Sequence, residues 1–160
     1  MSRFWKAVPD LDGADCVFSA VAGSFGLAHG LLPARHMTHR ILVLDDEEAI
    51  LFALQEFFSA CGYDVHTARE LADAKALVAS APYDLVIADL RLSGTHGAEG
   101  LELVGLIREQ YPSTRTVLLT AYGSPEMEAE ARRRGVDAFL HKPKPLPELA
   151  QIVLALLSQA

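Results

Sequence analysis

The sequence predicts an α/β fold in which helices cover both faces of a parallel sheet. Five short apolar runs recur along the chain, and the stretches between them carry apolar residues at helical spacing. Strands that alternate with helices in this way typically form parallel sheets with right-handed crossovers. At 160 residues and 51% hydrophobic content, the chain is also large enough to bury one core.

The first half of the predicted domain supplies three strands and two helices. Residues 41–44 form a continuous apolar run, as expected of a strand that is covered on both faces. An acidic turn follows, and then an apolar stripe at helical spacing runs from Ile50 to Cys61 and is closed by Gly62. A short strand is predicted at residues 63–67, a helix at 71–78, and a third strand at 84–89 after a break at Pro82.

The second half repeats the same unit twice. A helix with apolar residues from Leu101 to Ile107 ends before Pro112 and leads to a strand at residues 116–120. The next helix, at about 126–134, offers a core only Met127 and a few alanines, and it carries three consecutive arginines. Such a run is typical of a solvated face, and such weak anchoring is typical of a movable element. A strand at 136–141 then leads through three prolines into a last helix with apolar residues from 149 to 156.

Composition and charge disfavour several functional classes. Fourteen basic and twenty-one acidic side chains give a formal net charge of -7, which disfavours non-specific nucleic-acid binding. The two cysteines, Cys16 and Cys61, lie far apart without the spacing of a zinc or redox motif. This pattern favours a reduced, cytoplasmic protein.

Residues 1–38 are interpreted as an N-terminal extension that precedes a domain at residues 39–160. Three aspartates lie where a secretory signal would need its apolar core, and glycine, serine and histidine interrupt the stretch at 17–32 where a membrane span would have to lie. Two interpretations are left open. The extension is either poorly ordered or partly helical in the native protein, or it is an artefact of start-site choice, with Met37 as the natural start.

Polar side chains follow four of the five predicted strands at the point where each strand ends. Asp45 and Asp46 follow the first strand, Asp89 the third, Thr120 the fourth and Lys142 the fifth. The carboxyl ends of parallel strands meet at one edge of a sheet, and the spacings fit whole strand–helix units. Any one of these residues could be a helix cap or a turn former. Together they predict one cluster of functional groups.

The charges of this cluster predict a metal. Three carboxylates in one cleft repel each other by roughly 3 kcal/mol per pair at about 5 Å and an effective dielectric constant of about 20. Lys142 offsets part of this repulsion, and we expect Mg²⁺, which prefers oxygen ligands, to offset the rest. Mg²⁺ often binds carboxylates together with phosphoryl oxygens, so the cluster predicts phosphoryl transfer to an aspartate. Asp89 is the best nucleophile because it stands alone, whereas Asp45 and Asp46 are adjacent and suited to metal binding.

Four sequence blocks carry a family resemblance. They are Leu44-Asp45-Asp46-Glu47, Asp84-Leu85-Val86-Ile87-Ala88-Asp89, Leu119-Thr120-Ala121 and Phe139-Leu140-His141-Lys142-Pro143. In order, they resemble the signature blocks of the receiver domain of bacterial two-component response regulators, and the match covers residues 39–160. The resemblance implies a flavodoxin-like, doubly wound, five-stranded parallel sheet with the strand order 2-1-3-4-5 and five helices.

The resemblance also implies the roles of the site residues. Asp89 would be the phosphoacceptor, which receives a phosphoryl group from the phosphohistidine of a sensor histidine kinase or from a phosphotransfer protein. Asp45 and Asp46 would hold Mg²⁺ together with Asp89 and the backbone carbonyl of Arg91.

Further residues would control switching and the lifetime of the phosphate. Thr120 would be the switch hydroxyl, drawn toward the phosphoryl group, with Lys142 as the charge partner of that group. Phe139 stands where the family places an aromatic rotamer switch, although an ordinary core role is an equally good interpretation. Arg91 and Tyr122 stand at the two positions that receivers use to control water access to the acyl phosphate. Because both side chains are bulky, we predict a shielded and long-lived phosphate.

The loop after the acceptor departs from the family pattern. Residues 91–100 form a longer loop that lacks the usual Pro-Gly, so the family gives no guide to its rigidity. His96 in this loop is interpreted as an exposed side chain rather than a ligand or a general base.

Three functions are weighed on these grounds. A stand-alone receiver is favoured, because the chain ends directly after its last predicted helix. Its output would be protein contact through the face formed by the fourth helix, the fifth strand and the fifth helix, and a homodimer is left open. No enzyme activity is expected beyond autophosphorylation and autodephosphorylation, and no nucleic acid or membrane is expected as a partner. A haloacid-dehalogenase-type Mg²⁺-dependent phosphohydrolase uses a similar residue set, but residues 45–49 lack its Asp-x-Asp-x-Thr pattern. A phosphorylation-independent scaffold would be favoured only by an incomplete site.

Overall fold

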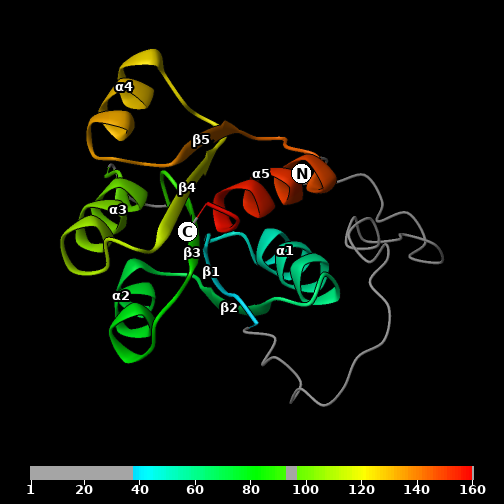
Figure 1. The fold of residues 1–160 in the computed structure, drawn as a ribbon. Helices are drawn as coiled ribbons and strands as arrows, with labels where there is room; N and C mark the ends of the chain where they lie inside the picture. Colours follow the sequence, from blue (N-terminus) through cyan, green and yellow to red (C-terminus); the bar gives the residue numbers. More distant parts are fainter. Residues whose placement is uncertain (1–37, 93–96, 160) are drawn as a thin grey trace, which may run out of the picture. The chain divides into compact units, whose positions relative to one another are not determined.

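The computed structural model describes residues 38–92 and 97–159. Within them, five strands and five helices alternate along the chain, as Figure 1 shows. The strands are β1 (Arg40–Leu44), β2 (Asp64–Ala68), β3 (Leu85–Asp89), β4 (Arg115–Thr120) and β5 (Ala138–His141). The helices are α1 (Glu48–Ala60), α2 (Leu71–Ser80), α3 (Glu99–Gln110), α4 (Pro125–Arg133) and α5 (Leu146–Leu157). The predicted alternation of strands and helices is confirmed.

The strands form one parallel sheet in the order β2-β1-β3-β4-β5. Figure 1 shows α1 and α5 on one side of this sheet and α2 and α3 on the other. The chain therefore winds outward from β1 in both directions, which confirms the doubly wound, flavodoxin-like sheet with five helices. In such a sheet the strand order reverses beside β1, and ligands bind at the carboxyl edge next to that point.

The central strands are buried on both faces. Leu42, Leu44, Val86, Ala88 and Leu118 are at most 2% exposed and pack with α2 and α3 in one cluster. The residues between them in each strand point to the opposite face, which α1 and α5 cover. This two-sided burial explains why the strands appear in the sequence as continuous apolar runs rather than as alternating ones.

The helix α4 is held to the domain by few apolar side chains. Ala131 is its only buried residue. Met127, one turn earlier on the same face, is half-buried and packs against the cluster beneath α2 and α3. The weak anchoring predicted for this helix is therefore confirmed.

Three strands begin later than predicted: β3 by one residue, at Leu85, and β2 and β5 by one and two residues. The helices that precede β2 and β5 end in glycine turns. Gly62 and Gly135 have φ angles of +89° and +80°, a conformation that glycine adopts without strain. The amides of the next residues, Tyr63 and Val136, each donate back into the preceding helix at 3.1 Å. These are Schellman turns, so Tyr63 and Val136 close a helix instead of opening a strand.

The interpretations of residues 1–38 as an extension lie outside the described residues, apart from Thr38. Among residues 38–92 and 97–159, no helix combines the length and apolar character needed to cross a membrane.

Candidate functional site

The strand register brings the three predicted acids together at the carboxyl edge of the sheet. Leu44 pairs with Ala88 across β1 and β3, so the next residues of the two strands, Asp45 and Asp89, emerge side by side. Asp46 follows directly in the β1–α1 turn. One carboxylate oxygen from each of the three acids lies within 4.8 Å of the other two. The predicted convergence of these acids is therefore observed.

Lys142 joins the acids of two strands. Its Nζ atom donates to Asp45 Oδ2 at 2.6 Å and to Asp89 Oδ2 at 2.9 Å. The side chains of Lys142, Asp45 and Asp89 are only 11%, 3% and 12% exposed, respectively. The backbone amide of Lys142 also donates to the carbonyl of Thr120 at 2.8 Å, which ties the end of β5 to β4. We refer to Asp45, Asp46, Asp89 and Lys142 as the carboxyl-edge cluster.

The carboxyl-edge cluster is short of positive charge. Burial raises the pKa of Asp45, and the charge and hydrogen bond of Lys142 only partly offset this effect. Burial likewise raises the pKa of Asp89, with Lys142 opposing the shift and the charge of Asp46 adding to it. Burial alone would lower the pKa of Lys142, but its two carboxylate partners outweigh burial and raise that pKa. The two buried acids thus ionise less readily than usual even with a lysine between them.

This chemistry fits a hard divalent cation. With all groups ionised, three carboxylates face one ammonium group, and all the ligand atoms are oxygens that lie close together. Mg²⁺ favours such oxygen donors and commonly binds through a few carboxylates while keeping some of its waters. The residues that could hold it are Asp45, Asp46 and Asp89, with the backbone carbonyl of Arg91 as the fourth predicted ligand.

The predicted switch hydroxyl, Thr120, ends β4 at the same edge. Thr120 is 1% exposed, and its Oγ1 atom accepts a hydrogen bond from the backbone amide of Tyr122 at 3.1 Å. The hydroxyl acts here as an acceptor, so its own proton remains able to donate to an oxygen that arrives at the site.

Phe139 lies on the edge strand β5, half-buried against the cluster beneath α2 and α3. Its ring meets that of His141 edge-to-face, with centroids 5.5 Å apart. Gly123, in the turn between β4 and α4, lies directly against both rings, and a Cβ atom there would come within 2.8 Å of each. The turn that follows Thr120 therefore rests on Phe139. This position is compatible with a core residue and with a packing switch, and the switch role stays a prediction.

The two residues predicted to control phosphate lifetime both lie at the surface. The backbone amide of Arg91 donates to Asp89 Oδ1 at 3.3 Å, while its side-chain Nη2 atom lies 3.6 Å from Met127 Sδ on α4. Tyr122 is 76% exposed. The prediction that their bulk shields the phosphate is not tested by these positions. The loop prediction falls partly outside the described residues, since residues 93–96, including His96, lie there.

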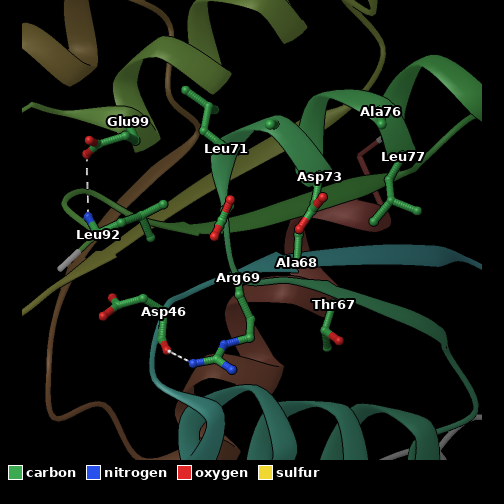
Figure 2. A pocket seen from close by; sticks show the side chains of 12 residues that line it. Asp46, Thr67, Ala68, Arg69, Leu71, Asp73, Ala76, Leu77, Leu92 and Glu99 are labelled. Carbon is green, nitrogen blue, oxygen red and sulfur yellow. Dashed lines mark hydrogen bonds between the residues drawn. The ribbon is translucent and has the colours of Figure 1, made fainter. Parts of the chain in front are cut away.

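One charged residue of this edge escaped the sequence reasoning. Arg69 directly follows β2, and its Nη2 atom lies 3.5 Å from the carbonyl oxygen of Asp46. Figure 2 shows its guanidinium reaching toward Asp46 across a hollow of about 1150 Å³, with Asp73 and Glu99 among the other lining residues. The rule that located the other site residues, a polar side chain directly after a strand, applies equally to Arg69. It was missed because the second strand was placed one residue too early.

Known proteins share this sequence pattern. A family model described as the response regulator receiver domain matches residues 41–154. The response regulator protein PilR of Pseudomonas aeruginosa is 34% identical over 114 residues, which make up 71% of this chain and 25% of PilR. The chain therefore spans about a quarter of the length of that relative.

Similarity also extends over nearly the whole of smaller proteins. The sporulation initiation phosphotransferase F of Bacillus subtilis is 31% identical over 117 residues, which make up 73% of this chain and 92% of that protein. A solved signal receiver domain of an HD domain-containing protein from Pseudomonas fluorescens Pf-5 is 34% identical, with a TM-score of 0.69. That match covers 76% of this chain and 96% of the solved chain.

Proposed function

The chain belongs to the response regulator receiver domain family, and from this membership we propose that it is a phosphorylation-controlled switch with Asp89 as its phosphoacceptor. Receiver domains are signalling domains rather than classical enzymes. The observation that carries the assignment to Asp89 is its carboxylate at the end of β3, held beside Asp45, Asp46 and Lys142. This arrangement supports phosphorylation of Asp89, because Lys142 and a cation bound by the neighbouring acids could offset the negative charge of the phosphoryl group.

The proposed chemistry is a transfer of the phosphoryl group from nitrogen to oxygen. A carboxylate oxygen of Asp89 forms a bond to phosphorus while the P–N bond of a phosphohistidine breaks. The released imidazole keeps the electron pair of that bond and takes up a proton, and Asp89 becomes an acyl phosphate. Lys142 can move a hydrogen bond from the carboxylate to a phosphoryl oxygen, and the hydroxyl of Thr120 can donate to another. Mg²⁺, held by the carboxyl-edge acids and the Arg91 carbonyl, would supply positive charge that offsets the charge of the phosphoryl group.

The proposed partners follow from that chemistry. The phosphodonor is a sensor histidine kinase or a phosphotransfer protein, and the output is contact with a further protein through α4, β5 and α5. We propose that the chain acts as a stand-alone receiver in the cytoplasm, and a homodimer through the same face would be compatible with it. A shift of Phe139 after phosphorylation would alter the packing of β5 and of the turn at Gly123, which lies on its ring.

We further propose that Arg91 and Tyr122 lengthen the life of the acyl phosphate by restricting the access of water. The double variant Arg91→Asn, Tyr122→Glu should lose its phosphoryl group faster than the wild-type chain, as measured by the decay of the phosphoprotein after the donor is removed. Equal decay rates would refute this role.

Incubation with acetyl phosphate and Mg²⁺ tests the assignment of the acceptor. We expect one phosphoryl group per chain by intact mass, stable in acid and labile in alkali, and absent from Asp89→Ala. Asp84→Ala is the matched control, because Asp84 flanks the opposite end of β3 and its side chain is 46% exposed. This control should be phosphorylated normally. Sustained turnover of the donor would instead support a phosphohydrolase, and the absence of labelling would support a scaffold that works without phosphorylation.

A further inference from the structure

The arginines of this domain differ in whether they have a carboxylate partner. Among the eight arginines of the described residues, six form ion pairs with aspartate or glutamate side chains. The other two, Arg69 and Arg91, form no ion pair within those residues. Both lie at the carboxyl edge, directly beside the acidic cluster. Two guanidinium groups are therefore available to bind an anion at the carboxyl edge. The proposed phosphorylation of Asp89 would place a phosphoryl group at this same edge.

Arg91 contacts both the acceptor and an output helix. Its backbone amide donates to Asp89 Oδ1 at 3.3 Å, and the Nη2 atom of its side chain lies 3.6 Å from Met127 Sδ on α4. The next amide along, that of Leu92, donates to the carboxylate of Glu99 at the start of α3 at 3.4 Å. The backbone is thus held on both sides, and the exposed side chain is the part of Arg91 that can move.

The contact between Arg91 and Met127 is weak and easily exchanged. A thioether sulfur is a poor hydrogen-bond acceptor, whereas phosphoryl oxygens accept charge-assisted hydrogen bonds that are about twice as strong as neutral ones. A guanidinium group also matches the geometry of a phosphoryl group, to which it can donate two parallel hydrogen bonds. A phosphoryl group on Asp89 would therefore compete with Met127 for the same side chain and win.

The helix that carries Met127 is stabilised mainly by contacts within itself, so it can move as a rigid unit. Its ion pairs are internal, joining Arg132 to Glu128 and both Arg133 and Arg134 to Glu130. They stabilise α4 as a helix without attaching it to the rest of the domain. Inward, the helix offers the core only the buried Ala131 and the half-buried Met127. The contact between Arg91 and Met127 is therefore one of the few that α4 makes outside itself.

We propose that Arg91 is a positioning residue that links the acceptor to α4, its guanidinium resting on Met127 in the unphosphorylated chain and turning to the phosphoryl oxygens when Asp89 is phosphorylated. This inference rests on the proposed function of Asp89. It adds a route, specific to this chain, by which the modification loosens α4. Phosphorylation withdraws Arg91 from Met127, and the helix loses one of its few external contacts.

Hydrogen exchange measured by mass spectrometry over residues 125–134 tests the link, with the full chain compared with and without acetyl phosphate and Mg²⁺. In the wild-type chain, phosphorylation should raise exchange in α4 by about fivefold or more, which is the scale of ordinary allosteric coupling. Arg91→Gln keeps a polar side chain of similar shape without the charge and should lose most of this increase. Arg91→Lys should retain part of it, because an ammonium group can still bind a phosphoryl oxygen.

Arg69→Gln is the matched control, since Arg69 also lacks a carboxylate partner among the described residues and is placed beside Asp46 rather than α4. At equal phosphorylation, measured by intact mass, this control should retain the increase in α4 exchange. The proposal is overturned if Arg91→Gln responds like the wild-type chain, if Arg69→Gln loses as much of the response, or if α4 of the phosphorylated wild-type chain does not change. A chain that accepts no phosphoryl group at all would instead contradict the function proposed for Asp89.

Discussion

Asp89 and Asp137 are equally buried acids at opposite edges of the same sheet, and they differ in the charge that surrounds them. The side chain of Asp89 is 12% exposed and that of Asp137 is 13% exposed. Asp89 shares the single ammonium group of Lys142 with another buried carboxylate. Asp137, in contrast, pairs with two guanidinium groups, those of Arg108 and Arg115. Two acids of equal burial therefore have very different electrostatic surroundings.

The carboxylate of Asp137 accepts hydrogen bonds from several donors at once. The backbone amide of Thr116 donates to it at 2.7 Å, the Thr116 hydroxyl at 3.1 Å and Arg115 Nη1 at 3.1 Å, and Arg108 adds a short hydrogen bond. This amino-edge cluster of Arg108, Arg115, Thr116 and Asp137 joins α3 to the starts of β4 and β5. The other three residues are all joined by hydrogen bonds to the Asp137 carboxylate, so the cluster is suited to holding elements together, although within the described residues Arg108 Nε and Arg115 Nε have no hydrogen-bond partner. The carboxyl-edge cluster has one ammonium group for three carboxylates, and it is suited to binding a cation and a phosphoryl group.

The largest expected effect comes from removing the charge of Asp137. Asp137→Asn leaves two partly buried guanidinium groups without a carboxylate, and we expect the free energy of unfolding to fall by about 3 kcal/mol. Urea unfolding measures this loss. Phosphorylation of Asp89 should survive at temperatures where the variant is folded. A loss of less than about 1 kcal/mol would mean that the amino-edge cluster contributes little to the stability of the domain.

Magnesium should stabilise the chain through the carboxyl-edge cluster and not through the amino-edge cluster. The expected gain in the free energy of unfolding is similar in size to the loss expected for Asp137→Asn. At a concentration of 100 times its dissociation constant, a ligand that binds only the folded state raises the free energy of unfolding by about 2.7 kcal/mol. We expect this gain in the wild-type chain and in Asp137→Asn, and we expect most of it to disappear in Asp45→Asn. Thermal unfolding with Mg²⁺ and with EDTA provides the measurement. An equal gain in Asp45→Asn would place the metal elsewhere.

Ionisation of Asp89 at the carboxyl edge should make the stability of the chain depend on pH. Burial raises the folded-state pKa of Asp89 above its usual value of 3.8, so the folded chain holds this proton more tightly than the unfolded chain does. The resulting stability is fully present below pH 3.8 and is lost as the pH rises through the folded-state pKa. Without Mg²⁺, Asp89→Asn should therefore be more stable than the wild-type chain at neutral pH.

Below the usual pKa of an aspartate, this advantage of Asp89→Asn should vanish, because the wild-type carboxyl group is then also neutral. Urea unfolding across a pH series without Mg²⁺ measures the difference. A gap between the two chains that stays constant from acid to neutral pH would show that it does not arise from ionisation of Asp89.

The same two edges explain what the sequence could predict. The carboxyl-edge cluster was predictable because each of its residues directly follows a strand, and the strands were visible as apolar runs such as residues 41–44. The ion pairs of Asp137 left no such signal, since Arg108 comes from the end of a helix and meets Asp137 only through tertiary packing. The contact between Arg91 and Met127 was missed for the same reason. Residues that share a strand end can be inferred from topology, whereas side chains that meet across elements cannot.

The smallest expected effects on stability come from removing one hydroxyl group at the amino edge and one at the carboxyl edge. Thr114 lies before β4, is 4% exposed, and donates to the carbonyl of Tyr83 at 2.8 Å. Ser124 caps α4, and its hydroxyl oxygen accepts from the amide of Met127 at 3.3 Å. Thr114→Val should lower the free energy of unfolding by about 1 kcal/mol, because the bonded carbonyl is left unpaired in the interior. Ser124→Ala removes a cap of about the same intrinsic strength.

The global cost of Ser124→Ala should nevertheless be smaller, at about 0.5 kcal/mol. A loosely anchored helix can open while the rest of the domain stays folded, so losses within α4 appear mainly as local opening. Hydrogen exchange should therefore rise in the first turn of α4 in Ser124→Ala, whereas Thr114→Val should change exchange across the whole sheet. If both variants lost the same global stability and α4 showed no local change, α4 would be anchored as firmly as the amino edge. In that case α4 would not open independently of the rest of the domain.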